Sequence, residues 1–278
     1  MFYLQLRNEL WKLFGKKRTY IGFAMILLCQ LAVALTFRYT HAIDRMIRVL
    51  EGNGYLADQF ISSLTIAGIM LIPLTYILLP LYVSLVGGDL VAKEAEDGTL
   101  RMILSRPISR FRLLLIKWLA GALFSLLLVI SLGVCGLVLA RIWFNWGGMF
   151  VFVPGEVFGL FDSSHGMQRY ASAHLLIVIK ACSVMGLGFM FSCFNMKPAA
   201  ATILALSFVF VNRILQEIPY FHDYQAWFLT YHLNTWLYLF NESIPWWRIL
   251  QSLSILLGFN VTFFLAGYTV FQMRDIKN

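Results

Sequence analysis

The chain is dominated by long apolar runs, each long enough to cross a lipid bilayer. A helix needs about 20 apolar residues to span a hydrocarbon core about 30 Å thick. Six runs meet that length, at residues 19–39, 61–87, 113–143, 172–194, 199–218 and 248–271. The sequence therefore predicts an all-α, polytopic membrane protein with six transmembrane helices. Pro73 and Pro80 are expected to kink the second helix, because proline removes helix hydrogen bonds.

The composition supports a membrane protein and argues against a soluble one. Hydrophobic residues make up 60% of the chain and charged residues only 13%, about half the charged fraction of a soluble domain. The net charge of +8 sits mainly beside the apolar runs, where it sets topology and meets anionic lipid headgroups. No nucleic-acid-binding motif is recognisable, so nucleic acid is not an expected partner. The cysteines and histidines show no metal-ligand spacing, and we expect no metal site.

Residues 1–18 form an amphipathic segment. Phe2, Leu6 and Leu10 recur at helical spacing, whereas the polar and basic side chains lie on other faces. Trp11 is suited to anchor such a helix at the lipid headgroups. We therefore expect an N-terminal interfacial helix that lies flat at the membrane surface.

The basic residues also indicate the topology. They gather at the N-terminus, in residues 88–112 and in the C-terminal tail. The positive-inside rule then places both termini and the 88–112 loop in the cytoplasm. Residues 144–170 are expected to form an aromatic outer loop, and residues 219–247 an outer re-entrant or interfacial segment.

The 88–112 segment has a pattern that a passive linker does not need. Acidic residues are followed by a Gly-Thr pair, an apolar stripe, a proline corner and a basic exit into the membrane. In that order the residues are Glu94, Glu96, Asp97, Gly98, Thr99, Leu100, Ile103, Leu104, Pro107 and Arg110. The pattern predicts a short helix with acidic N-terminal residues that docks in a groove of a partner. Gly98 is expected to allow a backbone turn that a side chain would resist.

This run, continued by Ser109 and Lys117, resembles the loop between spans two and three of type-2 ABC transporter permeases. Permeases associated with gliding motility and with nitrous-oxide reductase belong to that class. The amphipathic N-terminus and residues 271–276 are also similar to the ends of family members. The resemblance extends over the whole chain and implies a single transmembrane permease domain, residues 1–278.

The resemblance implies that the loop is a coupling helix seated in a cleft of a separate ATPase. The implied contact residues are Glu94, Glu96, Gly98, Thr99, Leu100, Leu104, Pro107, Ser109 and Arg110. Two ATPase subunits and a second permease copy or paralogue would complete a complex in the bacterial inner membrane. The chain has no GxxxxGK[ST] phosphate loop. ATP and Mg²⁺ would therefore bind the partner, and this chain would carry no cofactor and no catalytic site.

Two functions remain open at this point. One is export of a substrate that the sequence does not identify. The other is energy transduction, in which ATP hydrolysis drives a periplasmic partner and no solute crosses. A membrane-embedded enzyme is disfavoured, because no span carries paired acids or an HExxH arrangement.

Charge inside a predicted span is costly and commonly faces a cavity. Lys180, Arg213 and Glu217 are therefore candidates for lining the outer half of a substrate path. The alternative is structural: Lys180 would extend toward the interface. Arg213 and Glu217, spaced i and i+4, would form a clamp on one helix face.

Overall fold

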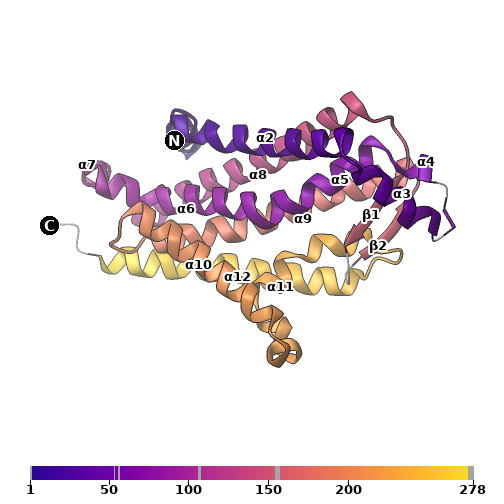
Figure 1. The fold of residues 1–278 in the computed structure, drawn as a ribbon. Helices are drawn as coiled ribbons and strands as arrows, with labels where there is room; N and C mark the ends of the chain where they lie inside the picture. The colour runs from indigo at the N-terminus through magenta and orange to yellow at the C-terminus, as the bar shows by residue number, and fades with distance from the viewer. Residues whose placement is uncertain (1, 53, 56, 106–107, 154–156, 275–278) are drawn as a thin grey trace.

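The computed structural model describes residues 2–52, 54–55, 57–105, 108–153 and 157–274. Six helical segments in these residues are long and apolar enough to cross a membrane, and they form an elongated bundle (Figure 1). They are α2 (Lys17–Tyr39), the segment Ser63–Glu96, α8 (Arg110–Trp143), α9 (Ser163–Ser192), α10 (Pro198–Glu217) and α12 (Trp246–Met273). The prediction of a mostly helical, multi-pass membrane protein is confirmed.

The second span is assembled from three helical pieces. They are α5 (Ser63–Pro73), the π-helical turn η1 (Leu74–Leu78) and α6 (Leu79–Glu96). The π-helical turn falls between the two prolines, where the regular hydrogen-bond ladder is interrupted. The helix runs on to Glu96, so residues 88–96 do not belong to a loop as the sequence had indicated. The rise in polarity after residue 87 did not end the helix, which continues through Gly88 until the chain turns at Gly98, where φ is positive.

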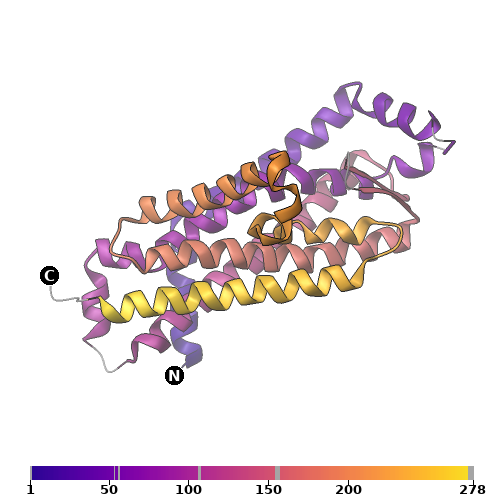
Figure 2. The ribbon, with the colours of Figure 1, turned by 90° about the horizontal axis from the view of Figure 1, so that it is seen from below.

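One end of the bundle carries α1 (Phe2–Phe14), α7 (Thr99–Leu104) and the C-terminal end of α12. We call it the elbow end. Figures 1 and 2 show α1 lying across the long axis of the bundle. The apolar stripe of α1 packs against the protein: Leu13 is buried, and Leu6 and Leu10 contact the same core. Trp11 instead is 70% exposed on the opposite face.

The other end carries α3 (Ala42–Gly52), α4 (Ala57–Phe60) and an antiparallel pair of strands. We call it the hairpin end. Strand β1 (Met149–Val153) pairs with β2 (Val157–Phe161), with Met149 opposite Phe161. The sequence had indicated an irregular loop here. Both strands are rich in aromatic and β-branched residues, which favour a pleated surface, and the fourth span starts earlier than expected, after the N-cap residue Asp162.

The aromatic segment after α10 is also folded. It comprises η2 (Pro219–Trp227), α11 (Leu229–Leu233) and η3 (Thr235–Phe240). No residue of η2 is buried, and Figure 1 shows this part projecting from the bundle. Leu229, Trp236 and Phe240, in contrast, are buried. Its second half is thus part of the packed hairpin end.

Helices α6 and α9 approach each other closely in the core. A Cβ atom on Gly87 would lie 2.3 Å from the Met185 carbonyl oxygen, and one on Gly188 would lie 2.7 Å from the Ser84 carbonyl oxygen. Small residues permit this contact between helix backbones in a membrane protein. The close contact fixes the second span against the fourth.

Candidate functional site

The predicted coupling segment forms a sharp turn between two helices, which we call the elbow (residues 93–105). Helix α6 ends at Glu96, and Gly98 adopts the left-handed conformation with φ of 72°. Nothing lies within 4 Å of a Cβ added at Gly98, so the requirement for glycine comes from the backbone. The predicted turn at Gly98 is confirmed.

The acidic residues of the elbow lie in a different place from the one predicted. They belong to the end of α6 and the turn after it, and the first turn of α7 carries no acidic residue. Lys93 pairs with Glu96 at 2.8 Å and with Asp97 at 3.0 Å. The side chains of Glu96 and Asp97 remain 42% and 49% exposed. These two acids are therefore accessible at the surface of the elbow.

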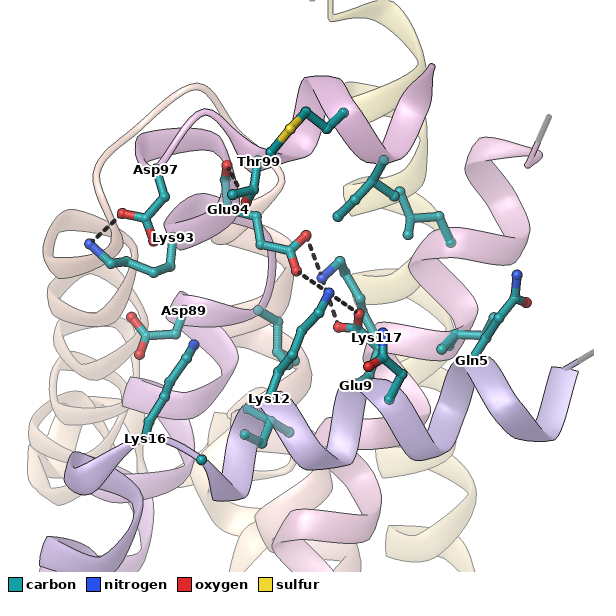
Figure 3. Close-up of a pocket in the computed structure, with 18 of the residues that line it drawn as sticks. Gln5, Glu9, Lys12, Lys16, Asp89, Lys93, Glu94, Asp97, Thr99 and Lys117 are labelled. Carbon is teal, nitrogen blue, oxygen red and sulfur yellow. Dashed lines mark hydrogen bonds and ion pairs between the residues drawn. The ribbon is translucent and has the colours of Figure 1, made fainter. Parts of the chain in front are cut away.

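Glu94 points the other way, into a group of four charged residues that we call the charge cluster (Glu9, Lys12, Glu94 and Lys117; Figure 3). Lys117 Nζ lies 2.9 Å from Glu9 Oε2 and 2.7 Å from Glu94 Oε2. Lys12 Nζ lies 2.6 Å from Glu9 Oε1 and 3.0 Å from Glu94 Oε1. Two acids and two lysines thus join α1, α6 and α8 directly beneath the elbow.

Three members of the charge cluster are largely removed from solvent, whereas the side chain of Lys12 is 40% exposed. The side chain of Lys117 is 1% exposed, that of Glu9 12% and that of Glu94 15%. A buried charge is tolerated when it is paired, and removing one partner costs about 3–5 kcal/mol. Each of these side chains therefore holds the others in place.

Two pKa shifts reflect this pairing. Burial alone would raise the pKa of Glu9, but the charges of Lys117 and Lys12 outweigh burial and lower it. Burial alone would lower the pKa of Lys12, but Glu9 and Glu94 raise it. Both groups are therefore charged at neutral pH.

A cavity of about 720 Å³ lies beside the charge cluster, between α1, α6, α7 and α8 (Figure 3). Its wall combines charged groups with apolar side chains such as Met102 and Ile103. Lys16 also lines it, and the pKa of Lys16 is lowered by burial and by the nearby Arg18. Arg18 itself pairs with the buried Asp89 of α6.

The apolar residues of α7 divide between two faces. Leu100 is 2% exposed and belongs to the core, Leu104 is half-buried, and Met102 is 66% exposed. Leu100 can therefore support the elbow only from inside. Thr99 Oγ1 donates to the Glu94 carbonyl oxygen at 3.3 Å across the turn. Pro107, the predicted corner, lies outside the described residues.

Ser109 and Arg110 start the third span and tie it to the last one. Ser109 Oγ accepts the amide of Arg112 at 3.3 Å as the N-cap of α8. Arg110 Nη1 donates to the carbonyl oxygens of Phe271 and Gln272, at 3.1 and 2.8 Å, and to that of Arg274 at 3.3 Å. Carbonyls at a helix C-terminus lack partners within the helix, so Arg110 satisfies the end of α12.

Two of the charged residues singled out in the spans, Lys180 and Arg213, lie against one aromatic ring. Lys180 Nζ lies 4.8 Å from the centre of the Tyr76 ring, and the Arg213 guanidinium lies 5.7 Å from it. Lys180, 3% exposed, donates to Asn234 Oδ1 at 3.2 Å. Arg213 pairs with Glu217 at 2.5 Å, as the i, i+4 spacing predicted. Tyr76 lies in the π-helical turn, which the sequence analysis had not linked to these charges.

Sequence reasoning did not assign Glu9 and Lys12 to the site. They are three residues apart on α1, and this helical spacing predicts that they pair with each other. Nothing in the neighbouring sequence predicts that they also contact Glu94 and Lys117. Lys117 was visible only as the downstream lysine of the family pattern. No sequence pattern indicated that Arg169 of α9 binds carbonyl oxygens at the hairpin end.

Comparison with known proteins places the chain in a family. Residues 12–276, most of the chain, match the family model described as "ABC-2 family transporter protein". The chain is also 25% identical over 209 residues to the uncharacterized protein YhcI of Bacillus subtilis (strain 168), a match that covers 73% of this chain and 66%, slightly under two thirds, of that protein. Permeases of this kind work with ATPase subunits and are not catalytic themselves. The chain belongs to the ABC-2 family of transporter membrane proteins.

Proposed function

We propose that this chain is the membrane-spanning subunit of an ATP-driven exporter and that separate ATPase subunits act on its elbow. The elbow is the observation on which the proposal rests. It consists of a glycine turn and a short helix between the second and third spans, and buried ion pairs hold it against α1 and α8. A push on a loosely attached loop would be absorbed locally. A push on this elbow would reach α1, α6 and α8 together.

The proposed ATPase contact is the exposed face of the elbow. Glu96 and Asp97 offer negative charge beside the Gly98 turn, and Met102 offers an exposed apolar side chain. Charge and apolar surface together suit a shallow cleft with a basic rim. Glu94 and Leu100 act in this proposal from within, by holding the elbow in shape.

Three routes lead from the elbow into the spans. Helix α6 continues directly from it into the second span. The charge cluster joins it to α1 and to the third span through Lys117. Arg110 adds the last span through the carbonyls at the end of α12. In the proposed complex a second permease copy or paralogue and two ATPase subunits, which bind ATP and Mg²⁺, complete the transporter.

The proposed orientation puts the elbow end in the cytoplasm of a bacterial cell, with the protein in the inner membrane. The basic residues support it, because Lys12, Lys16 and Lys117 all lie at that end. Membrane lipids are then partners along the spans.

A second candidate is energy transduction to a partner outside the membrane. The hairpin end favours it, because Phe152 and Phe158 are 46% and 43% exposed on an ordered pair of strands. Exposed aromatic side chains are typical of protein contacts. The ATPase would act on the same elbow in this function. The transmitted motion would then drive an outer partner instead of moving a solute across the membrane.

Affinity purification of the tagged chain in mild detergent tests the proposal. An ATPase subunit should co-purify with the wild-type chain. Reversing the exposed charges with Glu96→Lys and Asp97→Lys should remove it while the spans still insert, because both residues lie at the surface of the elbow. Glu51→Lys, at an exposed acid near the hairpin, is the matched control and should retain it. Wild-type association and wild-type coupled activity in the double variant would contradict the proposal. A co-purifying outer protein would favour the second candidate.

A further inference from the structure

Helix α1 has two faces that carry different chemistry. Its inner face packs through Leu10 and Leu13 onto the bundle and contributes Glu9 and Lys12 to the charge cluster. Its outer face carries Trp11 and Tyr3, whose exposed fractions are 70% and 71%. Helix α1 thus links an exposed aromatic surface to the charge cluster beneath the elbow.

The outer face pairs cationic with aromatic side chains. The Arg7 guanidinium lies 5.6 Å from the centre of the Trp11 ring. Tyr3 and Leu4 continue the same surface toward the N-terminus, and Leu4 is 57% exposed. Indole and phenol rings favour the headgroup layer of a bilayer, and a guanidinium matches the geometry of a phosphate. This combination suits an anionic phospholipid better than a soluble partner.

The placement of the helix is consistent with that ligand. Helix α1 lies across the bundle axis and next to the start of α2 (Figures 1 and 2). A helix perpendicular to membrane spans at their end lies parallel to the bilayer surface. The exposed Lys17, three residues after the end of α1, adds positive charge at the same level.

We propose that the outer face of α1 binds anionic phospholipid headgroups and that this binding orders the elbow through the charge cluster. Lipid contact at Arg7 and Trp11 fixes the position of α1 against the bundle. Glu9 and Lys12 on the inner face are fixed with it, and they hold Lys117 and Glu94. The elbow is then held in its observed shape. The proposal rests on the proposed function only in treating the elbow as the coupling element.

Hydrogen–deuterium exchange of the purified full chain in nanodiscs tests both steps. One preparation contains phosphatidylcholine alone, and the other replaces a third of it with phosphatidylglycerol. Amides of α1 should exchange about fivefold more slowly in the anionic discs for each basic residue engaged. Amides of residues 97–104 should slow in parallel. High salt should remove both differences, because it screens exposed charge.

Variants separate the two steps. Arg7→Gln with Trp11→Ala should abolish the lipid response at α1 and at the elbow. Arg38→Gln with Tyr39→Ala, an exposed basic and aromatic pair at the other end of α2, is the matched control and should leave both responses intact. Glu94→Gln keeps the shape of the side chain and should leave the response of α1 while weakening that of the elbow. Exchange in α9 checks that each variant is folded.

Equal exchange of α1 in the two lipids would overturn the proposal, as would an undiminished response in the Arg7 and Trp11 variant. An elbow response that survives Glu94→Gln and also Lys117→Met, with α1 still responding, would overturn the transmission step. No ATPase is present in this experiment. Failure of the proposed ATPase contact would therefore leave its result unchanged.

Discussion

At the elbow end, three helices are joined by ion pairs among Glu9, Lys12, Glu94 and Lys117, whereas at the hairpin end the Arg169 guanidinium binds three backbone carbonyls. Arg169 of α9 donates from Nη1 to the Leu239 carbonyl oxygen at 2.7 Å and to that of Asn241, and from Nη2 to that of Glu242 at 3.2 Å. Its guanidinium also lies 4.1 Å from the centre of the Phe161 ring. It therefore connects the fourth span, strand β2 and the chain after η3.

The difference lies in what each arrangement responds to. The elbow end depends on several charges of both signs, so a nearby charge on a partner or a lipid can alter the balance. The connection made by Arg169 at the hairpin end pairs a cation with neutral acceptors and rests on apolar packing, which such charges affect little. We infer that the elbow end is adjustable and that the hairpin end is a fixed cap.

The largest expected effect is at Lys117. Lys117→Met leaves Glu9 and Glu94 buried without their shared cation and should destabilise the protein by about 3–5 kcal/mol. Thermal unfolding in mild detergent measures the loss. Adding Glu9→Gln and Glu94→Gln to the variant should recover much of the stability, because no buried charge then lacks a partner. An unchanged unfolding temperature in Lys117→Met would show that the charge cluster does not support the elbow end.

Arg169→Met should have the next largest effect, at the hairpin end. It removes the bonds to three carbonyls and should cost about 2–3 kcal/mol, in the range for hydrogen bonds of charged groups. The loss should appear as faster amide exchange in residues 235–243, with the elbow unaffected. Arg169→Lys, which keeps the charge and loses the fork of donors, should restore only part of it. Equal loosening of both ends would erase the distinction between them.

Lowering the pH should loosen the hairpin end before it loosens the elbow end. Burial lowers the pKa of His232, and its bond to the Ala226 carbonyl offsets this only in part. The unfolded chain then binds more protons, so the stabilising contribution is present above an ordinary pKa of 6.5 and is lost as the pH falls below it. Glu9, with its lowered pKa, contributes stability above 4.5 that is lost only at more acidic pH. Residues 229–240 should therefore loosen first in an acid titration followed by amide exchange, and His232→Gln should remove that step.

The smallest effect on stability is expected at Arg213. Its side chain is 33% exposed and that of Glu217 is 64% exposed, so breaking their pair should cost less than about 1 kcal/mol. If Arg213 lines a substrate path, Arg213→Ala should change transport or substrate-stimulated ATPase activity without lowering the amount of assembled complex. If the pair is a clamp, assembly should fall instead. Glu217→Gln is the paired control, and normal transport with normal assembly in Arg213→Ala would refute both roles.

Part of the site was readable from local pattern. The Gly98 turn was predicted because only glycine enters the left-handed region without strain, and the Arg213–Glu217 pair followed from helical spacing. The orientation of Glu94 was not predicted, because nothing near it in the sequence indicates that Lys12 of α1 and Lys117 of α8 lie beside it in the folded protein. The hairpin was missed because aromatic residues between two spans are equally typical of an interfacial loop.

The sequence by itself determined the six spans, because bilayer thickness sets a length and an apolar composition that can be counted along the chain. It also determined the turn at the elbow, for which one glycine is sufficient. Only the tertiary structure decided what supports that turn. Lys12 meets Glu94 across 82 residues and Lys117 meets Glu9 across 108. Such pairs depend on how helices pack after they have formed, and packing follows from shape and burial across the whole bundle rather than from any short stretch of residues.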